Sequence, residues 1–240
     1  MKIDPEKCIG CFECINYCPM GAIAEGDDVA EIDQDACVVC GVCYKADVCP
    51  ADAIYLPDAS TIYPRSLRAA FSDPSVQFPE VMQGGRGTEE MKTNDVTGKF
   101  KRGHYGMTLE FGRPGIGTRL GEIEKITRVL CPAGIRLEEA NPVYFLLADK
   151  HTGQMKPEVL GEKVLSAILE FAIEEKDLEK TVGMLTEALK QVDTVVSWGV
   201  AARFAEDGSL PCRTKLTGLG LAVRPNAKIN MGLGRPIVEG

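Results

Sequence analysis

Eight of the ten cysteines in this 240-residue chain fall into two short runs near its beginning. The first run, C-x2-C-x2-C-x3-C-P, contains Cys8, Cys11, Cys14 and Cys18, and the second, C-x2-C-x2-C-x5-C-P, contains Cys37, Cys40, Cys43 and Cys49. Thiols at such close and regular intervals suit three kinds of chemistry: disulfide bonds, a structural zinc site, or an iron–sulphur cluster.

The compartment that the sequence indicates disfavours disulfides. The opening stretch MKIDPEKC lacks the basic patch and apolar core of a signal peptide. No apolar stretch approaches the roughly 18 to 20 residues that a membrane-spanning helix needs. We therefore expect a cytoplasmic protein that does not enter a membrane, and cytoplasmic thiols are normally kept reduced.

The spacing favours iron–sulphur clusters over zinc. Zinc sites usually pair two C-x2-C knuckles, whereas here a third cysteine follows at the same interval and each run ends in Cys-Pro. A C-x2-C-x2-C loop wraps three thiolates around one cubane, and the fourth cysteine of the bacterial run binds the other cluster. The spacing thus predicts two 4Fe-4S clusters, one held by Cys8, Cys11, Cys14 and Cys49, the other by Cys18, Cys37, Cys40 and Cys43.

The two runs are halves of a duplication. The stretch DPEKCIGCFEC aligns with DQDACVVCGVC at an offset of 29 residues, and CPMGAI aligns with CPADAI at an offset of 31. The change of offset comes from two extra residues before Cys49. Repeats of this kind predict two similar half-modules related by a pseudo-two-fold axis.

The charges are distributed unevenly along the chain. Residues 1–56 carry eleven acidic side chains against three lysines, whereas the other 184 residues carry 24 of each sign. An acidic module repels nucleic acid and anionic membranes and can steer a basic protein partner. The alternative is that these carboxylates only keep a small domain solvated. We expect no nucleic-acid partner.

Residues 1–56 resemble the bacterial ferredoxins that carry two 4Fe-4S clusters, down to the phrases CIGC…CP…GAI and CVVC…CP…AI. The departure from that family's pattern is the five-residue gap before Cys49. The resemblance implies a module that passes single low-potential electrons between redox proteins.

Residues 57–105 lack periodicity and contain Pro57, Pro64, Pro74 and Pro79, so we expect an irregular linker or strap. The aromatic residues within it favour an ordered strap lying on a surface. Its second half, Arg86 to Arg102, is mildly basic and could dock on the acidic module or on an anionic ligand.

Residues 106–240 show mixed periodicity and predict an α+β sandwich, an antiparallel sheet with helices on one face. Helices are expected from Thr118 (as N-cap) to about Leu130, from Pro157 through a stripe ending at Phe171, and over about 176–192. Strands are expected over 106–111, 135–139, 143–149, 194–204 and 220–234.

The stretch EFGRPGIGTRLGE is the most suggestive part of this body for chemistry. Glycines between a strand and a helix present backbone N–H groups to an anion, and arginines add charge-assisted contacts. Candidate cofactor-binding residues are Arg113, Gly115, Gly117 and Arg119; the alternative is a plain glycine turn. A second Gly-Arg-Pro turn occurs in the stretch 232–236. Cys131 and Cys212 are expected to be buried packing residues.

Residues 85–127 are similar to iron–sulphur proteins of the 6-hydroxynicotinate reductase type. That resemblance implies an anaerobic reductase body fed by the ferredoxin head, with flavin as a further cofactor and ligand contacts from Arg102, His104, Arg113 and Arg119. Our main hypothesis is a relay of single electrons through the two clusters to a reductase site on or beside the C-terminal domain. The alternative is a non-catalytic electron-transfer subunit. In either case we expect a redox partner protein, together with a catalytic partner subunit or a second copy of the chain.

Overall fold

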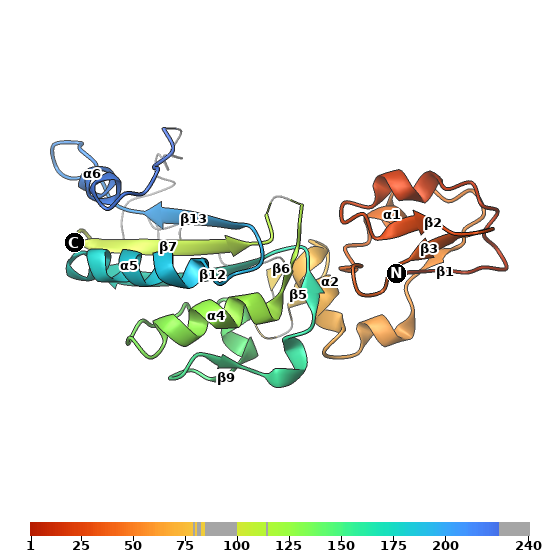
Figure 1. Ribbon diagram of the computed structural model, residues 1–240, viewed down its shortest axis with the longest axis horizontal. Coiled ribbons are helices and arrows are strands. Elements are labelled where there is room, and N and C mark those ends of the chain that lie inside the picture. The colour runs from red at the N-terminus through yellow and green to blue at the C-terminus, as the bar shows by residue number, and fades with distance from the viewer. Residues whose placement is uncertain (79, 81–82, 85–99, 114, 226–240) are drawn as a thin grey trace.

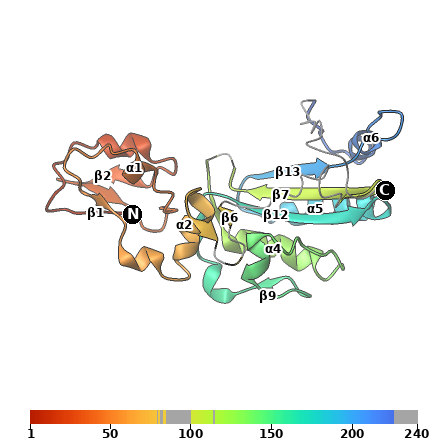
Figure 2. The same ribbon diagram turned by 180° about the vertical axis from the view of Figure 1, so that it is seen from behind.

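The computed structural model describes residues 1–78, 80, 83–84, 100–113 and 115–225. Residues 1–56 form a small lobe, and residues 100–113 and 115–225 form most of a larger one (Figures 1 and 2). Residues 57–78 run from the first lobe to the second. The predicted domain boundaries at residues 56 and 105 stay a prediction.

The small lobe is built from very short elements. Strand β1 (Lys2–Ile3) pairs with β4 (Ile54–Tyr55), and β2 (Ile23–Glu25) pairs with β3 (Ala30–Ile32), both antiparallel. A 3-10 turn, η1 (Glu13–Tyr17), and the one-turn helix α1 (Val42–Lys45) follow the two cysteine loops. Strands of two or three residues present little apolar surface, so cysteines supply part of this lobe's buried core.

Between the lobes the chain is more regular than its sequence predicts. The turn η2 (Asp58–Thr61) leads into helix α2 (Ser66–Ser72), and strands β5 (Gln77–Phe78) and β6 (Gln83–Gly84) form a small hairpin. The prediction of irregular chain was wrong at α2. Leu67, Ala70 and Phe71 lie one turn apart and are buried in the body's core, so packing stabilises a helix too short to be recognised by periodicity.

A three-stranded antiparallel sheet organises the larger lobe. Strand β7 (His104–Phe111) lies between β12 (Ala167–Glu174) and β13 (Val196–Ala201), with Leu109 opposite both Leu169 and Trp198. Alternate residues of β7 are buried, and they pack in one core with helices α4 (Leu120–Leu130) and α5 (Leu178–Leu189). The predicted α+β class is confirmed at this level.

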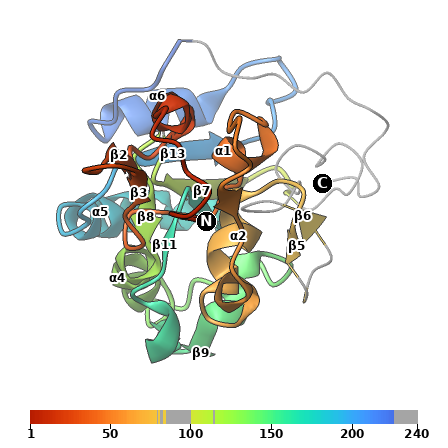
Figure 3. The same ribbon diagram turned by 90° about the vertical axis from the view of Figure 1, so that its right-hand side faces the viewer.

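Shorter elements surround this core. Strand β8 (Thr118–Arg119) pairs with β11 (Lys163–Val164), and β9 (Leu147–Asp149) pairs with β10 (Gln154–Met155). The 3-10 turns are η3 (Pro142–Leu146), η4 (Pro157–Val159) and η5 (Glu175–Asp177). Helix α6 (Pro211–Gly218) lies beyond β13, on the side away from α4, so the helices are not all on one side of the sheet (Figure 3).

The helix predicted from Pro157 to Phe171 is a correction. Only η4 forms there, followed by β11 and β12. The apolar residues fit two periods at once, because Ala167, Leu169 and Phe171 also alternate. Residues 167–174 form strand β12 because they pair with β7 along its whole length, and this pairing buries Ala167, Leu169 and Phe171 in the core.

Other element predictions need smaller corrections. The strand expected at 135–139 is a single bridge between Leu137 and Phe171, and the strand expected at 143–149 begins as η3 before β9. The N-cap of α4 is Arg119 rather than Thr118, which belongs to β8. Residues 220–225 form no strand, and the rest of that predicted strand, with the Gly-Arg-Pro turn at 232–236, lies outside the described residues.

Candidate metal centres

The duplication seen in the cysteine runs is also present in the backbone. Positive φ angles, which non-glycine residues seldom adopt, occur at equivalent positions of the two halves: Gly10 and Val39, Phe12 and Gly41, Gly21 and Asp52. At Val39 the left-handed conformation costs about 1–2 kcal/mol relative to the right-handed one. A β-branched residue therefore adopts the turn that glycine makes in the other half, which indicates that the loop geometry overrides local preference.

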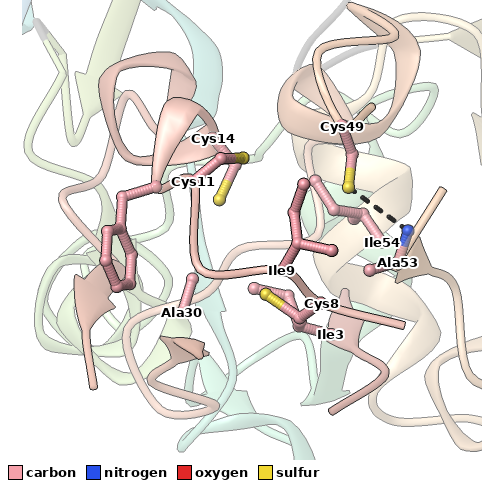
Figure 4. A pocket seen from close by; sticks show the side chains of 10 residues that line it. Ile3, Cys8, Ile9, Cys11, Cys14, Ala30, Cys49, Ala53 and Ile54 are labelled. Atoms are coloured by element: carbon pink, nitrogen blue, oxygen red, sulfur yellow. Dashed lines mark hydrogen bonds between the residues drawn. The ribbon is translucent and has the colours of Figure 1, made fainter. Parts of the chain in front are cut away.

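One group of four thiols surrounds a small apolar cavity in the first half. Cys8, Cys11, Cys14 and Cys49 line it together with apolar side chains that include Ile3, Ile9 and Ile54. Figure 4 shows the cysteine side chains directed toward a common space, with Cys49 reaching it from the second half. These are the four residues that the spacing assigns to one ligand set.

The other four thiols surround a second cavity. Cys18 from the first half lines it with Cys37, Cys40 and Cys43 from the second, beside Met20, Val38 and Gly41. The nitrogen of Met1 lies 3.6 Å from the sulphur of Cys37. We call the two sets the first centre (Cys8, Cys11, Cys14, Cys49) and the second centre (Cys18, Cys37, Cys40, Cys43).

The two cysteines that cross between the halves have matching environments. The backbone N–H of Ala22 donates to Cys18 Sγ at 3.1 Å, and that of Ala53 donates to Cys49 Sγ at 3.2 Å (Figure 4). Such donors stabilise negative charge on a sulphur, so they favour thiolate and, in a cluster, the reduced state. Both centres have the same supporting contact at the same place.

The two extra residues before Cys49 are accommodated by a helical turn. In the first half the chain runs through η1 from Cys14 to Cys18, whereas in the second half it makes α1. Asp47 then adopts a φ of 52°, which ends the turn and returns the chain toward Cys49. The longer gap changes the loop and leaves Cys49 in the first centre.

The donor chemistry of both cavities fits 4Fe-4S clusters. Burial, followed by the neighbouring thiols, raises the pKa of Cys14, and the same causes raise the pKa of Cys43 to about 11. Crowded thiols that resist ionisation are stabilised as thiolates by a bound cation, which releases their protons. The thiols surround their cavities: within the described residues, no three His, Cys, Asp or Glu side chains converge on a point where a single metal ion could sit.

The second centre lies against the body, and the loop around Gly117 touches it. A Cβ on Gly117 would lie 2.6 Å from Met20 Cε, a residue that lines the second cavity. Lys45 Nζ lies 2.5 Å from Asp73 Oδ2 after α2, and Arg119 pairs with Asp35. The hydrogen bond from Arg119, and then its positive charge, lower the pKa of Asp35. These contacts, all from the second half of the head and Met20, join the lobes on one side.

Arg68 of α2 makes the deepest of these contacts. Its side chain is 4% exposed, and Nη1 donates to the carbonyls of Gln34 (3.2 Å), Asp35 (3.0 Å) and Cys37 (2.7 Å). Its Nε donates to Glu162 Oε2 at 2.5 Å. Sequence reasoning missed this residue, and the available signal was an arginine inside the apolar stretch SLRAAF.

The glycine-rich residues singled out by sequence make contacts within the chain. The amides of Ile116 and Gly117 donate to the carbonyl of Gly112, and Gly115 has open space at its Cβ position. Arg113 donates to Glu110 at 3.0 Å, and Arg119 donates to the carbonyl of Gly161 as well as to Asp35. Of these residues, only Gly117, beside Met20, and Arg119, paired with Asp35, contact the head, and they form part of the joint between the two lobes. Anion binding by the loop stays a prediction.

The structure does not bring together the four residues that the second resemblance implies. Arg113 and Arg119 lie near the joint, whereas Arg102 pairs with Glu206 and His104 begins β7 at its other end. An eight-residue strand spans roughly 24 Å at ~3.4 Å per residue. A groove of about 350 Å³ lies at that far end, lined by His104, Arg136, Glu174, Asp177 and Lys180 among others.

The two remaining cysteines lie in the body. Cys131 and Cys212 belong to its hydrophobic core, 8% and 6% exposed, and burial raises the pKa of both thiols. Raised thiol pKa values make such cysteines unreactive at neutral pH.

Comparisons with known proteins match the small lobe. A model of the 4Fe-4S binding domain family matches residues 1–23. The chain is 46% identical over 55 residues to ferredoxin 7Fe of Hydrogenibacillus schlegelii (22% of this chain, 68% of that one). It is 48% identical over 52 residues to pyruvate synthase subunit PorD of Methanothermobacter marburgensis (22% and 58%). It is also 49% identical over 49 residues to a component of an ion-translocating oxidoreductase complex of Methanosarcina acetivorans (20% and 18%).

The matches cover only part of each relative. The chain spans less than a fifth of the ion-translocating complex component and between half and about two thirds of the other two relatives. No solved structure matches it. In the part of the chain that the structure describes, no helix is both long enough and apolar enough to cross a membrane. Through its N-terminal region the chain belongs to the 4Fe-4S ferredoxin family.

Proposed function

We propose that the chain is an electron-transfer subunit that holds two 4Fe-4S clusters, one in each centre, and that its body docks a catalytic partner. The observation that carries the proposal is the grouping of eight cysteines around two cavities, of which the second lies against the body. When bound, such clusters supply one-electron redox chemistry at low potential. The rest of the proposal concerns what the chain's own residues do.

The two centres face different neighbours. Lys45, Arg119 and Arg68 hold the second half of the head against the body. The first centre lies under Ile9, which is 68% exposed, with Tyr55 and Leu56 also exposed on that lobe. We therefore assign the first centre to exchange with an external redox protein and the second to exchange toward the body and whatever docks there. Acidic side chains on the head suit a donor or acceptor with a basic rim.

The reductase hypothesis places an acceptor in the body itself. The groove near His104 lies beyond the length of β7 from the joint, which is a long path for a single electron step. This arrangement favours the alternative, in which a partner subunit brings the acceptor to the joint. The relatives named as parts of pyruvate synthase and of an ion-translocating complex are consistent with a multi-subunit setting.

Iron content and cysteine variants test the ligand sets. Two clusters require about eight iron atoms per chain in protein purified without oxygen. Cys18→Ser is expected to disturb the cluster of Cys37, Cys40 and Cys43, and Cys49→Ser that of Cys8, Cys11 and Cys14. Cys131→Ser, outside both centres, is the matched control and keeps full iron. An unchanged iron content in both ligand variants would contradict the assignment.

Acid precipitation of the same protein separates the two functional alternatives. Flavin in the supernatant at about one per chain would favour a reductase body, since flavin carries hydride and single-electron chemistry that a docking module does not need. No flavin, with iron at about eight per chain, would favour the docking subunit. The next step is then to isolate the partner from cells that express the protein.

A further inference from the structure

Arg68 is a buried cation placed against the backbone of the second centre. Its guanidinium crosses from the body side into the loop of residues 34–37, where one nitrogen serves three carbonyls. The shortest of these bonds, 2.7 Å, is to the carbonyl of the ligand Cys37. Because the residue is 3% exposed, water screens its charge very little.

Glu162 is the counter-ion of this arginine. It comes from the body, between η4 and β11, and its side chain is 15% exposed. It binds Nε, the side of the guanidinium away from Nη1 and the cysteine loop. The pair is thus oriented, with the positive member toward the second centre and the negative member toward the body.

Among the described residues, the first centre has no buried arginine or lysine in the corresponding position. The equivalent of Cys37 in the first half is Cys8, at the offset of 29 residues. Within the described ranges, no arginine or lysine side chain donates to the Cys8 carbonyl, although the sulphur hydrogen bonds of the two centres match. The second centre therefore differs from the first in this pair, as it also does in the Met1 ammonium group beside Cys37 Sγ.

We propose that the Arg68–Glu162 pair raises the reduction potential of the second centre above that of the first. The proposal rests on the two clusters of the proposed function. Reduction adds a negative charge to a cluster, and a buried cation stabilises that charge more strongly than an exposed one. Arg68 supplies the cation, and Glu162 limits its effect and holds it in place. Arg68 is a positioning residue, which acts through the loop of Cys37 and its own charge.

Two substitutions that remove opposite charges from the pair test whether it sets the reduction potential. Arg68→Met removes the cation and is expected to lower the potential of one of the two clusters. Glu162→Gln keeps an acceptor for Nε but removes the counter-charge, and is expected to raise the potential of the same cluster. A purely structural role for the pair gives no reason for shifts of opposite sign. The measurement is a redox titration of the full chain, purified without oxygen, followed by electron paramagnetic resonance.

Arg119→Met is the matched control. Arg119 also bridges the 34–37 loop and the body near residue 161, but its side chain is 43% exposed and its partner Asp35 is 68% exposed. Solvent screens such a pair, so its shift is expected to be smaller than either of the others. A shift of Arg119→Met as large as that of Arg68→Met would overturn the role of burial.

The proposal is overturned if both Arg68→Met and Glu162→Gln shift the potential in the same direction, or if neither shifts it, with iron content equal to that of the wild type. Should Arg68→Met lose iron, Glu162→Gln alone decides: an upward shift of one cluster supports the proposal, and no shift or a downward one overturns it. Iron content separates this inference from the proposed function. Full iron with unmoved potentials overturns only the inference, and absence of iron from the wild type overturns both.

Discussion

The two lobes are held together by different means. In the small lobe the paired strands are two or three residues long, and three of the nine buried residues of its core, Cys14, Cys37 and Cys43, are cysteines. In the body, β7 and β12 pair over eight residues, and the core side chains of β7 are fully buried. One lobe depends on what its thiols bind, and the other on apolar burial.

The largest expected effect comes from removing the clusters. Chelation of iron after oxidation should unfold residues 1–56, because the lobe then keeps only very short strands and a small apolar core that includes crowded, unliganded thiols. The sheet of β12, β7 and β13 should stay folded. Hydrogen exchange followed by mass spectrometry measures both lobes in one sample. Equal loss of protection in both would show that the lobes form a single cooperative unit.

A core truncation in the body is the converse experiment. Leu109→Ala in the central strand should lower the free energy of unfolding of the body by about 2–5 kcal/mol, since it leaves a cavity in a close-packed core. Urea denaturation followed by Trp198 fluorescence measures this, while the visible absorbance of the clusters should stay at the wild-type level. Phe204→Ala, at a side chain 43% exposed, is the control and should change stability by less than about 0.5 kcal/mol.

A smaller effect is expected at the joint. Gly117 has a φ of 77°, and an added Cβ would meet Met20 Cε at 2.6 Å. Gly117→Ala should therefore cost about 1–2 kcal/mol in backbone strain and also push the lobes apart. Gly115→Ala has a similar positive φ but open space around its Cβ, so it carries the strain alone. Faster hydrogen exchange at α2 in the first variant and not in the second would show that the contact matters.

The smallest effect is a pH dependence confined to the body. Burial, and then the hydrogen bond to Glu175, raise the pKa of Tyr105 well above its usual value. Stability from the neutral phenol is fully present below the unfolded pKa of about 10 and is lost as pH rises through the folded pKa. Tyr105→Phe should flatten this loss. Urea midpoints at about pH 8 and about pH 11, around that unfolded value, measure it. An equal loss in both proteins would assign it to other groups.

The sequence was sufficient to predict which cysteines lie together, because that grouping depends on residues close to one another in the chain. Cysteines two residues apart constrain each other locally, and the duplication relates Cys18 to Cys49, so the two groups of thiols could be predicted from the spacing. Strand β7 and helix α5 also have clear periods. Arg68 and Glu162 are 94 positions apart, and no local pattern connects them.

The error at β12 has a physical cause. Val164, Ile168 and Phe171 fall at helical intervals, while Leu169, Phe171 and Ile173 alternate, so the segment satisfies both periods. Only a partner strand distinguishes them, and β7 lies far back in the sequence. The same holds for α2, where burial against the body stabilises two turns that propensity alone leaves undecided.

The position of Cys49 has a consequence for how the molecule is made. Because its sulphur faces the space surrounded by Cys8, Cys11 and Cys14, and Cys18 faces the space of the later cysteines, neither cavity is lined completely by one half of the head. During synthesis the first centre therefore lacks its fourth cysteine until residue 49 has been added to the chain. The second cavity has its four cysteines once residue 43 is made, and the first has its four only after residue 49.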